Sequence, residues 1–201
     1  MGVTRTSVLD GLERRATWRS AALALAVAVP SNLALAGYVL PALQARRPEA
    51  MDGDFLVMID LEPLRSVDEI YRIYDLYTPD ILDLVRLLYA LDFAMPLALA
   101  VLLFCLIGAL LRALGVKGRG RALLVLPFVS VTFDFVENAL SLLLLDRYQS
   151  GEVLPTLARA ATLATTLKFV ALSAVGVTVV ALLGRGIVVA ARRRLGRRGG
   201  A

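Results

Sequence analysis

Four long apolar stretches dominate this sequence and limit what it can fold into. They lie at about residues 18–40, 87–111, 122–145 and 161–183, and each is bounded by charged residues or by Pro and Gly. A helix needs about 20 mostly apolar residues to cross about 30 Å of hydrocarbon, so each stretch is long enough to span a bilayer. The sequence therefore predicts an all-α integral membrane four-helix bundle that forms a single transmembrane domain.

Composition supports this assignment and argues against several classes of enzyme. Of the 201 residues, 58% are hydrophobic, which is more than a domain surrounded by water needs. The chain has no histidine and one cysteine, Cys105, so it lacks the commonest metal ligand and general base and has no internal disulfide. We expect no cofactor and no metal site, and we do not expect a zinc hydrolase, a serine–histidine triad or a dithiol enzyme.

The first apolar stretch has a second interpretation. Arg14, Arg15 and Arg19 followed by an apolar run and then by small residues also form the pattern of a secretory signal peptide. The run is long for such a peptide and carries Pro30 and Asn32 near its centre. These departures favour a membrane span, with cleavage as the alternative.

The placement of arginines predicts the orientation. Basic residues lie before the first span, between spans two and three, and in the tail at 185–201, whereas the loop at 41–86 has ten acids against five arginines. The positive-inside rule then gives a plasma (inner) membrane protein with both termini in the cytoplasm. Five tail arginines are predicted to bind anionic lipid, or else only to fix the topology: Arg192, Arg193, Arg194, Arg197 and Arg198. Because the basic residues lie at helix ends, we expect no nucleic-acid partner.

The outer loop of about 45 residues is predicted to be partly helical. Ser66 and Glu69 have the spacing of a capping box and open an amphipathic stretch over 67–74. Thr78 followed by Pro79 is a second helix start, so span two is expected to begin as a helix outside the membrane. Residues 55–61 are predicted to be extended. The loop is either a simple connection or a surface on which a partner docks.

Polar side chains within the spans are the second strong signal. A charged residue at the bilayer centre costs about 3 kcal/mol on insertion scales. At about 1.5 Å per residue, the polar residues of all four spans lie roughly 8 to 16 Å from the outer end, in one layer. We therefore predict a buried polar core that contains three acids, one lysine and two asparagines: Asp92, Asp134, Glu137, Lys168, Asn32 and Asn138.

The charges of this core do not balance. Three carboxylates face one ammonium, so Lys168 is expected to neutralise Glu137 or Asp134, and Arg86 is expected to reach towards Asp92. The leading hypothesis is an outward-facing pocket that binds a proton, a cation, or a polar lipid or metabolite. The alternatives are a structural or accessory subunit of a membrane complex and, third, a carboxylate enzyme acting on lipid. Self-association and a membrane-protein partner are both open.

The polar residues also carry a resemblance. An arginine and a tyrosine lead into an aspartate and a proline in span two, an aspartate-x-x-glutamate-asparagine follows in span three, and a lysine lies in span four. This pattern resembles a family of uncharacterised bacterial four-span proteins over about residues 78–183. The resemblance implies the four-span topology and the choice of residues, and it implies no activity. The candidate binding residues are Asn32, Arg86, Tyr89, Asp92, Asp134, Glu137, Asn138 and Lys168.

Overall fold

The computed structural model describes residues 11–46 and 64–198, and within these ranges the regular structure is helical throughout. Four segments of 28 to 38 residues are long and apolar enough to cross a bilayer. The prediction of an all-α membrane bundle is thereby confirmed, and the chain is a multi-pass membrane protein. The elements are α2 (Trp18–Ala34), η1 (Leu35–Val39), α3 (Leu40–Ala45), α4 (Val67–Tyr74), α5 (Pro79–Asp92), α6 (Ala94–Ala113), η3 (Gly118–Val125), α7 (Leu126–Gln149) and α8 (Pro155–Arg198).

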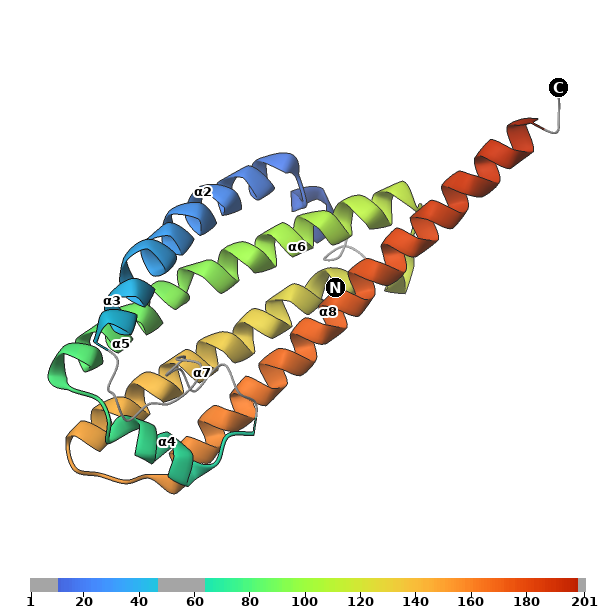
Figure 1. Cartoon of the computed structure of the whole chain (residues 1–201). Coiled ribbons are helices and arrows are strands. Elements are labelled where there is room, and N and C mark those ends of the chain that lie inside the picture. Colours follow the sequence, from blue (N-terminus) through green and yellow to red (C-terminus); the bar gives the residue numbers. More distant parts are fainter. Residues whose placement is uncertain (1–10, 47–63, 199–201) are drawn as a thin grey trace, which may run out of the picture.

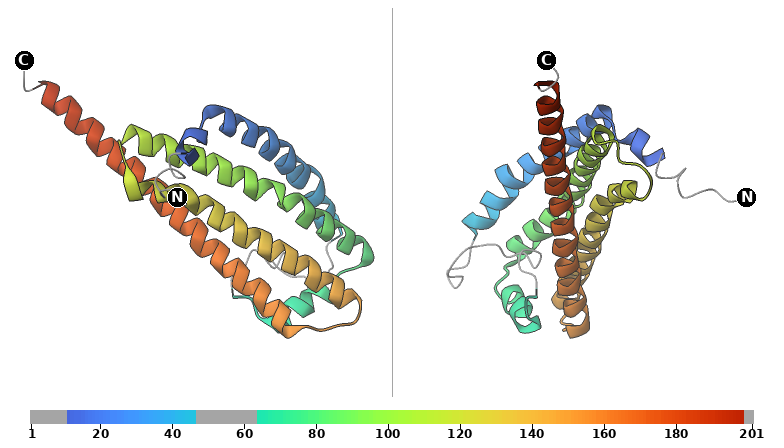
Figure 2. Two further views of the ribbon diagram at one scale, coloured as in Figure 1. Left: turned by 180° about the vertical axis from the view of Figure 1, so that it is seen from behind. Right: turned by 90° about the vertical axis from the view of Figure 1, so that its right-hand side faces the viewer.

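The long helices run alongside one another, and the short helix α4 covers one end of the bundle (Figure 1). Helix α7 packs most extensively against α8, and α2 packs most extensively against α6. Figure 2 shows that α2 is inclined to α8 when the bundle is seen from the side. Helix α8 continues past the other helices as far as Arg198, so the predicted basic tail begins as a direct extension of the fourth span.

Prolines determine where the long helices are interrupted. Pro96 has no N–H and its ring clashes with the carbonyl four residues earlier, which belongs to Asp92. The helix is accordingly interrupted at Phe93, between α5 and α6. The break thus lies one turn before Pro96, and it places Asp92 at the end of a helix. Pro41 stands in the same relation to Gly37, which lies in the π-helical turn η1.

The helix starts predicted in the outer loop are confirmed. The Ser66 hydroxyl accepts a hydrogen bond from the backbone N–H of Glu69 at 3.3 Å, and α4 covers the predicted residues. Helix α5 begins at Pro79 with Thr78 as its first flanking residue, although the Thr78 side chain makes no capping hydrogen bond there. The predicted extended segment at 55–61 lies outside the described residues.

The bundle has two apolar cores, one towards each of its ends. One lies at the α4 end and contains Leu88, Tyr89 and Leu144 among its buried residues. The other lies at the opposite end and contains Phe104 and Leu124. The polar residues of α5, α7 and α8 fall between these two cores along each helix. The polar core is therefore enclosed along the bundle axis by close-packed apolar side chains.

Candidate functional site

A layer of polar side chains from three helical segments lies between the two apolar cores. We call it the polar layer. Most of its members are buried, and Asp92 and Lys168 are partly accessible. It comprises Asp92 of α5, five residues of α7 and two of α8: Ser130, Asp134, Glu137, Asn138, Ser141, Thr165 and Lys168.

The best-satisfied part of this layer joins α7 to α8. The Lys168 ammonium lies 2.6 Å from Glu137 Oε2 and 3.1 Å from Asp134 Oδ1. The Thr165 hydroxyl donates to Glu137 Oε1 at 2.8 Å. Small buried residues beside them, Ala161 and Ala164, allow the two helices to approach closely. The predicted pairing of Lys168 with Glu137 or Asp134 is confirmed, and the one ammonium lies within ion-pair distance of both acids.

Asp92 joins the layer from the other side. The Asn138 amide donates to Asp92 Oδ2 at 3.0 Å, which ties α7 to the break between α5 and α6. Asn138 itself is fully buried, while Asp92 stays partly accessible. The helix interruption places Asp92 where its side chain contacts α7 and borders a cavity.

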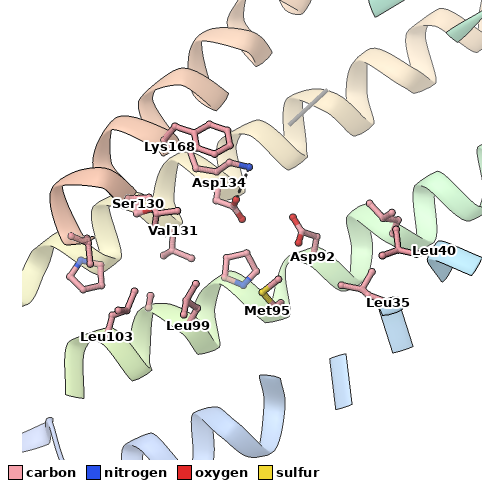
Figure 3. Close-up of a pocket in the computed structure, with 17 residues that line it drawn as sticks. Leu35, Leu40, Asp92, Met95, Leu99, Leu103, Ser130, Val131, Asp134 and Lys168 are labelled. Atoms are coloured by element: carbon pink, nitrogen blue, oxygen red, sulfur yellow. Dashed lines mark ion pairs between the residues drawn. The ribbon is translucent and has the colours of Figure 1, made fainter. Parts of the chain in front are cut away.

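That cavity is a cleft of about 370 Å³ with mostly apolar walls. Two of its lining side chains from the middle of the spans, Leu99 of α6 and Leu172 of α8, are 42% and 38% exposed, so the cleft opens on the lateral face of the bundle. Four polar side chains border it, three of them charged: Ser130, Asp92, Asp134 and Lys168. Figure 3 shows the Asp92 and Asp134 carboxylates turned towards the same space.

One buried carboxylate oxygen in this cleft is unsatisfied. Asp134 has 9% of its side chain exposed and uses Oδ1 for Lys168, while Oδ2 has no hydrogen-bond partner among the described residues. A buried charge without full hydrogen bonding is unfavourable. The layer also holds three carboxylates against the single ammonium of Lys168. It therefore has unused capacity to accept hydrogen bonds and positive charge.

Arg86 does not reach Asp92. Its guanidinium lies 3.7 Å from Asp83 and 3.7 Å from Asp146, and it donates to Gln149. These partners lie at the α4 end of the bundle, where the Arg86 side chain stays partly exposed. The expectation that Arg86 extends down to the layer is wrong in this structure, because closer acids satisfy it.

Asn32 and Tyr89 also lie outside the layer. Asn32 is exposed and borders a second groove of about 300 Å³, lined by α2 and by α6 residues such as Met95. Helix α2 contacts chiefly α6, so the Asn32 face does not turn towards α7. Tyr89 is buried in the apolar core at the α4 end. Five of the eight candidate residues are thus brought together, and Asn32, Arg86 and Tyr89 are not.

Two features of the site were not predicted from the sequence. The contact of Thr165 with Glu137 is one of them, although its position three residues before Lys168 is a usable signal for such a partner. The apolar walls of the cleft, such as Leu172 and Phe169, carry no such signal. In a membrane protein their residue types do not distinguish a cavity wall from a lipid-facing surface.

The chemistry available here is ionic and hydrogen-bonding. The described residues contain no group of three His, Cys, Asp or Glu side chains that is able to hold a metal ion. What the cleft offers is a pair of carboxylates and a lysine beside apolar surface. Comparison of the chain with protein-family models, curated proteins and solved structures finds no match.

Proposed function

We propose that this membrane protein binds an amphipathic molecule in the lateral cleft, with its polar group against Asp92 and Asp134. The observation that carries the proposal is the cleft itself, which has charged side chains at one place and apolar walls elsewhere. Ligand pockets commonly combine apolar walls with a few convergent polar groups. Apolar walls do not stabilise a bare ion, so their presence favours a ligand that has an apolar part as well as a polar group.

A purely structural role explains only part of the polar layer. The contacts of Lys168 with Glu137, together with the Thr165 hydrogen bond, are sufficient to join α7 and α8. Asp92 and Asp134 are two further carboxylates within membrane spans, and each raises the free-energy cost of inserting its helix into the bilayer. Both border the cleft, where a ligand is able to compensate them.

The arginine distribution sets the proposed location of this site. With the η3 end on the cytoplasmic side of the inner membrane, the polar layer lies in the outer half of the bilayer. The lateral opening then gives access from the lipid phase. A ligand is accordingly expected to enter by partitioning into the membrane first.

The test is to fill the cleft without touching its charges. Leu172→Trp adds bulk to a cleft wall, and Leu167→Trp is a matched control because Leu167 lies on the same helix with 37% exposure but outside the cleft lining. Ten-carbon probes are added to nanodisc-embedded protein: decylamine, decyltrimethylammonium, decanol and decanoate. At least one is expected to raise the unfolding temperature of wild type and Leu167→Trp but not of Leu172→Trp. Equal responses of both variants to every probe contradict the proposal.

A further inference from the structure

We infer that the ligand of the cleft is an amine in its protonated form, carried on an apolar body. This inference rests on the proposed function and specifies the polar group of the ligand. It follows from a count of donors and acceptors at the cleft surface and from the arrangement of its charges. The shared chemistry is a primary ammonium, whether it belongs to a free amine or to a lipid headgroup.

The cleft has two carboxylates at its border, and the only side-chain donors among its lining residues are the Ser130 hydroxyl and the Lys168 ammonium. Asp92 and Asp134 are carboxylates, and an ionised carboxylate only accepts hydrogen bonds. The one cationic donor, Lys168, is already within 2.6 Å of Glu137 and 3.1 Å of Asp134. Asp134 Oδ2 remains buried and without a hydrogen-bond partner among the described residues. A ligand that supplies N–H groups satisfies this oxygen, whereas a ligand that only accepts does not.

The positions of the two carboxylates suit one small cation. Asp134 is held by Lys168 through Oδ1, and Asp92 is held by Asn138 through Oδ2. Both carboxylates face the same space from opposite sides of the cleft (Figure 3). An ammonium there has three N–H donors to direct at them, and its charge-assisted hydrogen bonds are stronger than neutral ones.

The negative charge at the cleft also excludes ligands whose polar group is an anion. A carboxylate or phosphate placed beside Asp92 and Asp134 is repelled, and Lys168 is already engaged with Glu137. One bound ammonium lowers the formal excess of negative charge in the layer from two to one. The Phe169 ring also borders the cleft, and the Lys168 ammonium lies over it at 5.7 Å from its centroid.

The experiment compares the binding of probes that share a ten-carbon chain and differ in their polar head group. In nanodiscs of phosphatidylcholine, decylamine is expected to bind about tenfold more tightly than decanol, from the strength of a hydrogen bond to a charged group. Decyltrimethylammonium has the charge without N–H donors and is expected to lie between them, and decanoate is expected to be the weakest. Affinities are taken from the dependence of unfolding temperature on probe concentration.

Two variants test the carboxylates. Asp134→Asn is expected to bring decylamine and decanol to within about twofold of each other, because the charged acceptor is lost. Asp92→Asn provides the same test at a less buried position if Asp134→Asn does not fold. Asp146→Asn, at the outer end of α7 and away from the cleft, is the matched control and should keep the tenfold preference.

The outcomes separate this inference from the proposed function. If all four probes bind equally and Leu172→Trp blocks them, the amphipathic site stands and the preference for amines is wrong. If Leu172→Trp blocks none of them, both are wrong. With the amine preference established, nanodiscs of phosphatidylethanolamine identify the source. Competition with decylamine assigns the site to the lipid headgroup, and its absence assigns it to a free amine.

Discussion

Helix α8 and the first span, which runs from α2 through η1 to α3 and borders the cleft at Leu35 and Leu40, are held to the bundle in different ways. Helix α8 is joined to α7 by buried charge, with Glu137 fully buried between Lys168 and Thr165. Helix α2 packs chiefly on α6 and has Ala24 as its buried residue, while Leu23 and Leu33 are largely exposed. One side of the cleft therefore depends on ionic contacts and the other on the fit of apolar surfaces.

The segments that flank α2 on either side are both anchored to the bundle. Before its start, the Arg112 guanidinium donates to the Glu13 and Ala16 carbonyls at 3.0 and 2.7 Å, and Glu13 pairs with Arg121 at 2.7 Å. After its end, Val39 and its neighbours enter the apolar core beneath α4. Between these anchors α2 lines the second groove together with α6, and the first span borders the cleft only at Leu35 and Leu40.

The largest effect is expected when Lys168, the lysine that joins α7 to α8 through ion pairs, is replaced. Lys168→Met leaves two buried carboxylates without their ammonium, and breaking a buried pair in this way costs about 3 to 5 kcal/mol. We expect a correspondingly large loss in the free energy of unfolding, measured for the protein in nanodiscs. Adding Glu137→Gln to Lys168→Met should restore part of the loss, because one uncompensated charge is then removed.

The chain supplies its own control for this prediction. Lys117, its only other lysine, is exposed in the connection before η3. Lys117→Met removes the same charge and should change the free energy of unfolding by less than about 0.5 kcal/mol. Equal effects at Lys117 and Lys168 show that the buried ion pairs do not stabilise the α7–α8 interface.

The next test disturbs the anchoring of α2. A Cβ added to Gly108 of α6 meets the Ala16 side chain at 2.6 Å, so the segment leading into α2 must shift. Overpacking of this kind costs roughly 1 to 3 kcal/mol, partly offset by the better helix propensity of alanine. We expect Gly108→Ala to lower the unfolding temperature and to increase proteolysis in the segment that precedes α2.

Its matched control lies on α8. A Cβ at Gly176 has no atom within 4 Å, so Gly176→Ala should be neutral or slightly stabilising. A Gly108→Ala variant that behaves like Gly176→Ala contradicts the close contact between α6 and the segment that precedes α2.

The difference between the two sides also explains which helix contacts are predictable from the sequence and which are not. The spacing of Asp134 and Glu137 puts them on one helix face, and lipid forces such groups towards a partner, so their meeting with Lys168 was predictable. The position of α2 follows from apolar packing, which different helix rotations satisfy nearly equally. For this reason Asn32 was predicted to join the buried polar core, whereas it is exposed on α2.

A similar reason explains why the partners of Arg86 and the presence of the cleft were not predictable from the sequence. The sequence shows that an arginine stands less than two turns from Asp92, but the competing acid Asp146 lies 60 residues further along the chain. Its proximity depends on how α5 and α7 align. The cleft depends on gaps between four helical segments, and the sequence of any single helix does not encode such a gap.

A smaller effect is expected at the hydroxyl that completes the ionic side. Thr165→Val keeps the shape of the buried side chain and removes the donor to Glu137, at a cost of about 1 kcal/mol. Thr178→Val is the control, because the Thr178 hydroxyl is exposed and donates to the Ala174 carbonyl of its own helix. A loss of stability in the control equal to that in Thr165→Val would assign the effect to the helix backbone.

The smallest effect is expected at Asn32, and it distinguishes the two sides most directly. Asn32 is exposed on α2, so Asn32→Leu replaces a polar group on a lipid-accessible surface and should change the free energy of unfolding by less than about 0.5 kcal/mol. Asn138→Leu makes the same exchange at a fully buried position that donates to Asp92, and about 1 to 3 kcal/mol is expected there. The two variants are compared by unfolding in the same nanodiscs. A loss at Asn32 as large as that at Asn138 means that α2, too, is held by polar contacts in the membrane.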